Sequence, residues 1–90
     1  MSEDQTTRRK RLLFRSWHRG TREADLLLGP FADAHLGAMN PGQLDRYEAL
    51  LGESDATLYD WISGRATPPP ERDSDVLRLL RGTRFTPRAG

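Results

Sequence analysis

Residues 40–64 read NPGQLDRYEALLGESDATLYDWISG and predict two consecutive helices. In the first, Asn40 is suited to the cap, Pro41 fits the first turn, and Gln43 is placed to complete a capping box. Gly52 is expected to end this helix. Four apolar side chains recur at helical spacing and form one face: Leu44, Tyr47, Leu50 and Leu51.

The second helix of this stretch has the same kinds of start and stop signals. Ser54 is the expected cap and Gly64 the expected stop. Three apolar side chains mark its inward face: Leu58, Trp61 and Ile62. We therefore expect Trp61 to be largely buried. The pattern does not predict whether Trp17 and Tyr59 are buried or exposed.

Two further helices are predicted before this stretch. The first runs over Arg8–His18, Gly20 stops it, and Thr21 caps a second helix that runs to about Leu36. Pro30 lacks a backbone donor, so it predicts either a kink or a split after Leu28. The expected apolar positions are Leu12, Leu13, Phe14 and Trp17 in the first helix, and Ala24, Leu27, Leu28 and Phe31 in the second.

A fifth helix is predicted after the three prolines Pro68–Pro70, over Glu71–Arg81. Its inward side chains are expected to be Val76, Leu79 and Leu80. Short connections between short helices are typical of an all-α, compact five-helix bundle. We expect a single, monomeric domain over residues 8–82, with a disordered N-terminus at 1–7 and a disordered C-terminal tail at 83–90.

The composition limits both the size and the chemistry of the chain. Its 90 residues are 36% hydrophobic and 30% charged, which fits one small globular domain with a modest core. The chain has no cysteine, which excludes disulfides and thiolate chemistry. No apolar run exceeds three residues, so no membrane association is expected, and residues 1–7 do not resemble a signal or transit peptide. The expected location is the cytoplasm.

Positive charge is concentrated near the N-terminus. Residues 1–22 carry seven basic and two acidic side chains, whereas residues 23–80 carry four basic and eleven acidic ones. The basic residues of the first helix include Arg8, Arg11 and Arg15, with aromatic residues between and after them. This combination is one signature of a nucleic-acid surface, although the aromatic side chains fall on the face expected to be core. Nucleic acid is therefore the less favoured partner.

Few residues could carry catalysis. His18 and His35 lack the spacing of metal ligands, and no phosphate-binding glycine loop or nucleophile elbow is present. Acidic pairs such as Asp73 and Asp75 fit solvated helix caps. We therefore predict that the chain is not an enzyme and that it has no catalytic or metal-binding residues.

The segment between the first two helices allows two interpretations. Gly20 and Thr21 fit a helix stop and a cap, and Glu23 complements the helix dipole. The same turn also predicts that Arg19 and Glu23 are exposed around one tight corner, with Gly20 allowing a partner backbone to approach. On the second interpretation, alanine at Arg19 or Glu23 would abolish function and leave the fold intact.

Several segments together resemble the succinate dehydrogenase assembly factor 2 family, the flavinators. They are residues 8–15 (RRKRLLFR), the Arg19-Gly20-x-x-Glu23 corner, residues 25–31 (DLLLGPF), residues 58–64 (LYDWISG) and the closing amphipathic helix. The resemblance covers residues 8–82. It implies a small five-helix bundle found in the bacterial cytoplasm or, with a transit peptide, in mitochondria. Thirteen arginines against one lysine favour a bacterial source.

The resemblance also implies a function. Such a factor binds the flavoprotein subunit of succinate dehydrogenase, or of fumarate reductase, and promotes covalent attachment of FAD to a histidine of that subunit. It binds no cofactor itself. By position, the resemblance makes Arg19, Gly20 and Glu23 the partner-binding residues. We expect the basic side chains Arg8, Arg11 and Arg15 to bind the partner as well. Two alternatives remain at this point: an antitoxin-like nucleic-acid-binding regulator, and an adaptor with another client.

Overall fold

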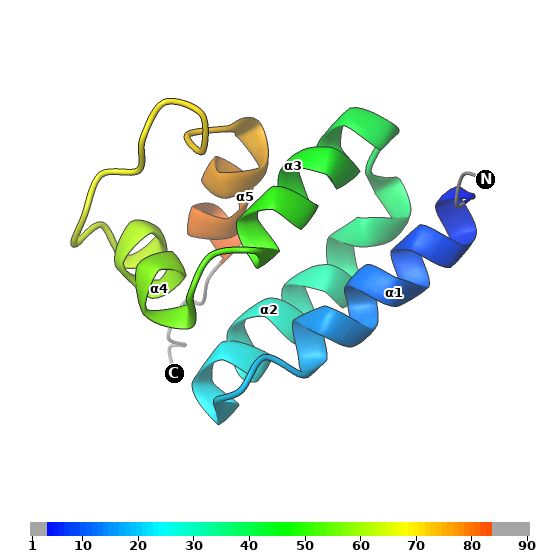
Figure 1. The fold of residues 1–90 in the computed structure, drawn as a ribbon, viewed down its shortest axis with the longest axis horizontal. Helices are drawn as coiled ribbons and strands as arrows, with labels where there is room; N and C mark the ends of the chain where they lie inside the picture. The colour runs from blue at the N-terminus through cyan, green and yellow to red at the C-terminus, as the bar shows by residue number, and fades with distance from the viewer. Residues whose placement is uncertain (1–3, 84–90) are drawn as a thin grey trace.

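The computed structural model describes residues 4–83 and shows five α-helices and one 3₁₀ helix within that range (Figure 1). The elements are α1 (Gln5–Trp17), α2 (Arg22–His35), η1 (Leu36–Ala38), α3 (Pro41–Leu51), α4 (Asp55–Ser63) and α5 (Asp75–Thr83). The described residues contain no strand, so the prediction of an all-α fold is confirmed.

The helices lie in two groups, α1 with α2 and α4 with α5. α1 and α2 run side by side in opposite directions, and η1 leads from α2 into α3 (Figure 1). α3 packs against α1 on one side and against α5 on the other, and α5 also contacts α4. α3 is thus the central element that joins the two groups.

The core is built from apolar side chains of every helix. Leu12, Leu44, Tyr47, Leu77 and Leu80 are fully inaccessible to solvent. Trp61 retains 7% exposure, as predicted. Three positions differ from the expected pattern: Phe14 is 62% exposed, Leu79 is 38% exposed, and Leu77 takes the inward place that was assigned to Leu79.

The N-terminus of α1 lies earlier than predicted. The helix begins at Gln5 because the Asp4 carboxylate accepts a hydrogen bond from the Thr7 amide over 2.7 Å and caps it. Residues 4–7, which were expected to be disordered, therefore form the cap and first turn. Residues 1–3 and 84–90, expected to be disordered, lie outside the described residues.

Pro30 neither splits nor ends α2, which continues unbroken from Arg22 to His35. Gly29, just before it, is required by a close approach: a Cβ at this position would collide with the indole ring of Trp17 on α1. Glycine in a helix interior costs about 1 kcal/mol relative to alanine. Here it allows the aromatic side chain of α1 to lie directly on the backbone of α2.

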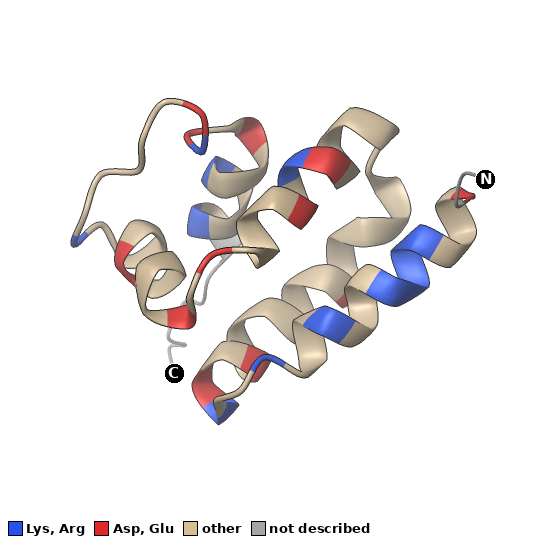
Figure 2. Ribbon diagram, viewed as in Figure 1, with Lys and Arg blue, Asp and Glu red and all other residues tan. Residues whose placement is uncertain are grey.

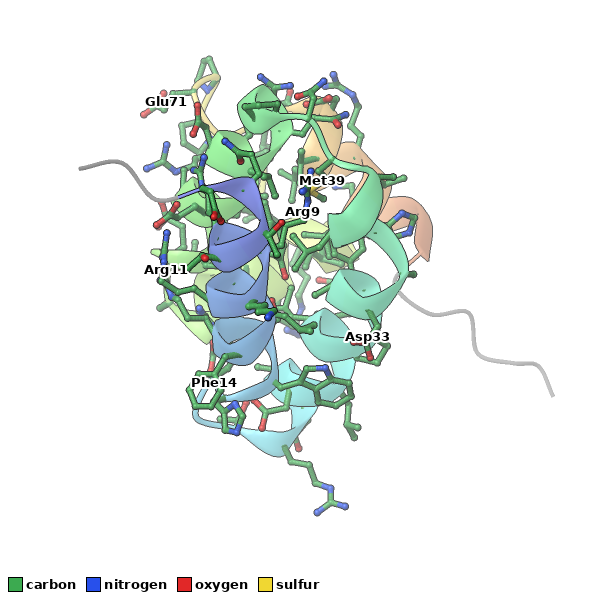
Figure 3. All side chains as sticks on the ribbon, turned by 90° about the vertical axis from the view of Figure 1, so that its right-hand side faces the viewer. Arg9, Arg11, Phe14, Asp33, Met39 and Glu71 are labelled. Carbon is green, nitrogen blue, oxygen red and sulfur yellow. The ribbon has the colours of Figure 1, made fainter. Side chains whose placement is uncertain are left out.

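The turn after α2 is held by an arginine of α1. Arg9 donates hydrogen bonds to the carbonyl oxygens of Leu36 (3.0 Å) and Met39 (2.8 Å), and Figure 3 shows Arg9 pointing toward Met39. These carbonyls lie at the end of a helix, where partners within the helix run out. Arg9 thus fixes the chain as it enters α3.

The predicted signals around α3 and α4 are present. Asn40 and Gln43 form a complete capping box, Ser54 caps α4, and Gly64 ends it with a φ of 84°. α5 begins at Asp75, four residues after the predicted Glu71, and it ends at Thr83, two residues after the predicted Arg81, so that residues 82 and 83 belong to the helix. The delay follows from a turn after the prolines, in which the Pro69 carbonyl accepts from the amides of Arg72 and Asp73.

Candidate protein-binding surface

The turn between α1 and α2 has the capped geometry that the sequence indicated. Thr21 caps α2 by accepting a hydrogen bond from the Ala24 amide, and Gly20 has a φ of 142° that favours glycine. The Asp25 carboxylate accepts from the backbone amide of Arg19 over 2.6 Å. Gly20 and Glu23 are both exposed.

The side chain of Arg19 does not share this exposure. Its Nε donates to Asp55 Oδ1 (2.8 Å), Nη1 to the Leu51 carbonyl (2.6 Å) and Nη2 to the Glu53 carbonyl (2.7 Å). Only 9% of the side chain is exposed. The expectation of an exposed Arg19 is therefore wrong, because the guanidinium is occupied by the end of α3, the following loop and the start of α4. We call this set of contacts the Arg19 clamp.

Three further arginines of α1 also contact their own chain. Arg8 pairs with Asp45 (2.7 Å) and Glu48 (2.9 Å), and Arg11 pairs with Glu48 (2.9 Å). Arg15 donates to the Leu51 carbonyl over 3.4 Å and lies 3.8 Å from Glu48. Figure 2 shows the basic residues along α1 and the acidic residues on α3.

These pairs have an electrostatic signature. The hydrogen bond from Arg11, and then that from Arg8, lower the pKa of Glu48 below its ordinary value of 4.5. Two carboxylates of α3, Asp45 and Glu48, thus offset part of the positive charge of α1, which leaves less of it for phosphates than the sequence indicated. Phe14, by contrast, projects away from the helix pair (Figure 3) and stacks on His18 with the ring centres 3.9 Å apart.

An apolar groove runs between α2 and α4, beside the Arg19 clamp. It has a volume of about 710 Å³. We call it the α2/α4 groove; its lining residues are Thr21, Glu23, Ala24, Leu26, Leu27, Leu28, Asp55, Ala56, Leu58 and Tyr59. Leu26 is 58% exposed and Tyr59 is 53% exposed. Of the predicted contact residues, Glu23 lies in this lining.

The α2/α4 groove was not predicted from the sequence. One signal was available: three consecutive leucines, Leu26–Leu28, cannot all face inward on one helix, because successive residues are 100° apart. The structure buries Leu28, half-buries Leu27 and exposes Leu26. The same spacing applies on α4, where Leu58 is buried and the next residue, Tyr59, is exposed.

The described residues offer little for catalysis. Within residues 4–83, no group of three histidine or acidic side chains is placed to hold a metal ion. Tyr47 has the one large pKa shift found in this range, to about 12, because burial disfavours its charged form. It lies in the core, where its hydroxyl is hydrogen-bonded to Ser16, and it does not line the α2/α4 groove. None of the helices in this range is long and apolar enough to cross a membrane.

Fold and surface together define a small helical protein with an apolar groove and a basic helix that is partly paired with acidic residues of its own chain. A family model described as "Flavinator of succinate dehydrogenase" matches residues 10–84. The chain belongs to this family, and the resemblance read from the sequence is confirmed.

Named relatives agree with this assignment. The chain is 41% identical over 83 residues to "Succinate dehydrogenase assembly factor 2, mitochondrial" of Meyerozyma guilliermondii, a match that covers 88% of this chain and 62% of the relative. It is 41% identical over 73 residues to "FAD assembly factor SdhE" of Acetobacter pasteurianus, covering 81% and 67%. It is 40% identical over 73 residues to "Succinate dehydrogenase assembly factor 2, mitochondrial" of Dictyostelium discoideum, a match that covers 81% of this chain and 52% of the relative. The chain thus spans between about half and two thirds of these relatives.

Proposed function

We propose that this protein is an assembly factor that binds the flavoprotein subunit of a succinate dehydrogenase and promotes its covalent attachment of FAD. The observation that carries the proposal is the family match over residues 10–84, which includes all of α2, α3, α4 and α5. Relatives named as assembly factors for succinate dehydrogenase or FAD support the same function.

The surface of the described domain is consistent with a factor that acts by binding. The α2/α4 groove is open and apolar, and Glu23 at its edge is exposed. We infer that the protein itself is not an enzyme and carries no FAD, and that the reacting histidine and flavin both belong to the client. Its proposed location is the bacterial cytoplasm, and the fumarate reductase flavoprotein is proposed as a second client.

Co-expression tests this function. The flavoprotein subunit is produced with and without this chain in a host that lacks its own factor, and covalent flavin is read as fluorescence of the denatured flavoprotein band on a gel. We expect a strong band only with the chain present. Equal fluorescence in both samples would contradict the proposal, and flavin that co-purifies with the chain would contradict the inference that it carries none.

A further inference from the structure

The α2/α4 groove has an apolar floor and apolar walls. Leu28 and Leu58 form a buried floor, exposed by only 1% and 2%. Leu26 and Tyr59 stand on opposite helices, and each exposes more than half of its surface. Exposed apolar side chains that gather around one hollow are typical of a binding site, whereas single ones are common on any surface.

The charges at the groove are all of one sign. Glu23 and Asp55 are the ionisable carboxylates of the lining, and no lysine or arginine is among the described residues that line it. Oδ1 of Asp55 is neutralised by Arg19, whereas Glu23 is exposed. A phosphate-bearing ligand such as a dinucleotide would meet these carboxylates without a matching cation. A positively charged group would be attracted.

The openness of the groove favours a segment of protein over a small molecule. Small-molecule sites enclose about 70–90% of the ligand, and the projecting Leu26 and Tyr59 leave this groove open to solvent. Apolar grooves between helices are a common way of receiving an apolar stretch of a partner chain.

The Arg19 clamp determines where one wall of the groove lies. Through Asp55 and the Glu53 carbonyl it holds the first residue of α4 and the loop before it against the α1–α2 turn. Arg19 is therefore a positioning residue: it sets the wall that carries Tyr59, while Glu23 faces the solvent from α2.

We propose that the α2/α4 groove receives an apolar segment of the flavoprotein subunit that carries a lysine or arginine beside its apolar side chains, with Glu23 pairing with that cation. This inference rests on the proposed function. It extends the contact surface from a charged corner to an apolar groove with one acidic edge.

Binding measurements on exposed positions test the groove directly. Affinity of the flavoprotein subunit is measured by calorimetry for the parent chain and for Leu26→Ser and Tyr59→Ser. Each side chain is already exposed, so the variants should fold, which circular dichroism checks. Each variant should raise Kd by about ten- to hundredfold, which corresponds to the roughly 1.5–3 kcal/mol that burial of such a side chain contributes.

Phe14→Ser is the matched control. Phe14 is an equally exposed apolar side chain, 62% accessible, and it is not part of the groove lining. This variant should bind like the parent chain. Loss of affinity in the groove variants alone supports the inference, and equal affinity in all three variants overturns it.

The acidic edge is tested by charge. Glu23→Gln should weaken binding, Glu23→Lys should weaken it further, and raising the salt concentration should weaken the parent chain more than Glu23→Gln. A salt dependence unchanged by Glu23→Gln would overturn the pairing with a cation.

Cross-linking identifies the occupant. Tyr59 is replaced by the photoreactive benzoylphenylalanine, and the linked peptide is sequenced by mass spectrometry. We expect a flavoprotein peptide with apolar residues next to a lysine or arginine. A link to a second copy of the chain, or to a peptide without such a residue, would overturn the proposed occupant.

The two proposals fail in distinguishable ways. If the parent chain neither binds the flavoprotein nor raises covalent flavin, the proposed function is wrong. If the parent chain does both and the groove variants do so equally well, the function stands and the groove inference alone is wrong.

Discussion

The guanidinium of Arg19 and the carboxylate of Asp55 lie 2.8 Å apart, although 36 positions separate them in the chain. This pair and two neighbouring bonds to backbone carbonyls join the α1–α2 turn to the α3–α4 connection. The sequence indicated that Arg19 would be free for a partner. Its role in the folded chain changes what a substitution there would do.

Arg19→Ala should lower the free energy of unfolding by about 2–4 kcal/mol, because it leaves two carbonyls and a carboxylate without their donor. Urea denaturation measures the loss. Glu23→Ala, at an exposed position of the same corner, should change stability by no more than about 0.5 kcal/mol. Equal stability of the two variants would show that the clamp contributes little.

For this reason, loss of flavinylation by Arg19→Ala would not by itself identify a contact residue. Glu23 gives the cleaner test, since its substitution leaves the clamp in place.

Gly29→Ala should destabilise the protein by about 1–3 kcal/mol, because the added methyl group would collide with the Trp17 ring. Gly82→Ala is the control: nothing lies within 4 Å of a Cβ there. Since alanine is the better helix former, Gly82→Ala should raise stability by up to about 1 kcal/mol. Denaturant melts of both variants compare the two sites.

A double-mutant cycle isolates the ring contact. In a Trp17→Ala background, Gly29→Ala should cost nothing or should stabilise, because the obstacle is gone. If Gly29→Ala still lowered stability in that background, the steric conflict would involve a group other than the Trp17 ring.

Tyr47 should make the protein lose stability in strong alkali. Burial raises the pKa of its phenol to about 12 in the folded state, against 10.0 ordinarily. The folded state therefore keeps a proton that the unfolded chain releases. The stabilisation is fully present below pH 10 and is lost as the pH rises toward about 12, by about 2–3 kcal/mol in total.

Tyr47→Phe should flatten this alkaline limb in a pH series of denaturant melts. Ser16 keeps its bond to the Leu12 carbonyl in that variant (2.8 Å), so the cost at neutral pH should be only about 0.5–1.5 kcal/mol. An unchanged alkaline limb would assign the loss to other groups.

Glu48 should make the protein lose stability at acid pH, as Tyr47 does in alkali. Its pKa is lowered in the folded state by hydrogen bonds from Arg11 and Arg8, so its contribution is present above pH 4.5 and is lost as the pH falls through the lowered value. Glu48→Gln should be less stable than the parent chain at neutral pH and should show a shallower acid limb. Glu71→Gln, at an exposed position, should leave both unchanged.

Local signals made most of the helices predictable. The capping box of Asn40 and Gln43 and the cap at Ser54 each depend on residues three positions apart, and both were correctly predicted. Asp4 acts in the same way, and its spacing to Thr7 was available in the sequence as a signal for an earlier start of α1.

The direction of Arg19 could not be predicted in this way. Its three acceptors lie 32 to 36 residues along the chain, so they come near it only after α1, α3 and α4 have packed. The same holds for the α2/α4 groove, whose existence depends on how far apart two helices lie. Pro30 is a third case: its backbone predicted either a kink or a split, and the structure excludes the split, since α2 is continuous over Arg22–His35.

The Arg19 clamp also has a consequence for motion. Since one side chain ties the α1–α2 turn to the α3–α4 connection, neither loop loosens without losing the bonds that hold the other. We therefore expect the two loops to open as one unit, so that their backbone amides would exchange hydrogens with solvent at a common rate. Rigidity at this end of the molecule is shared by two distant parts of the chain.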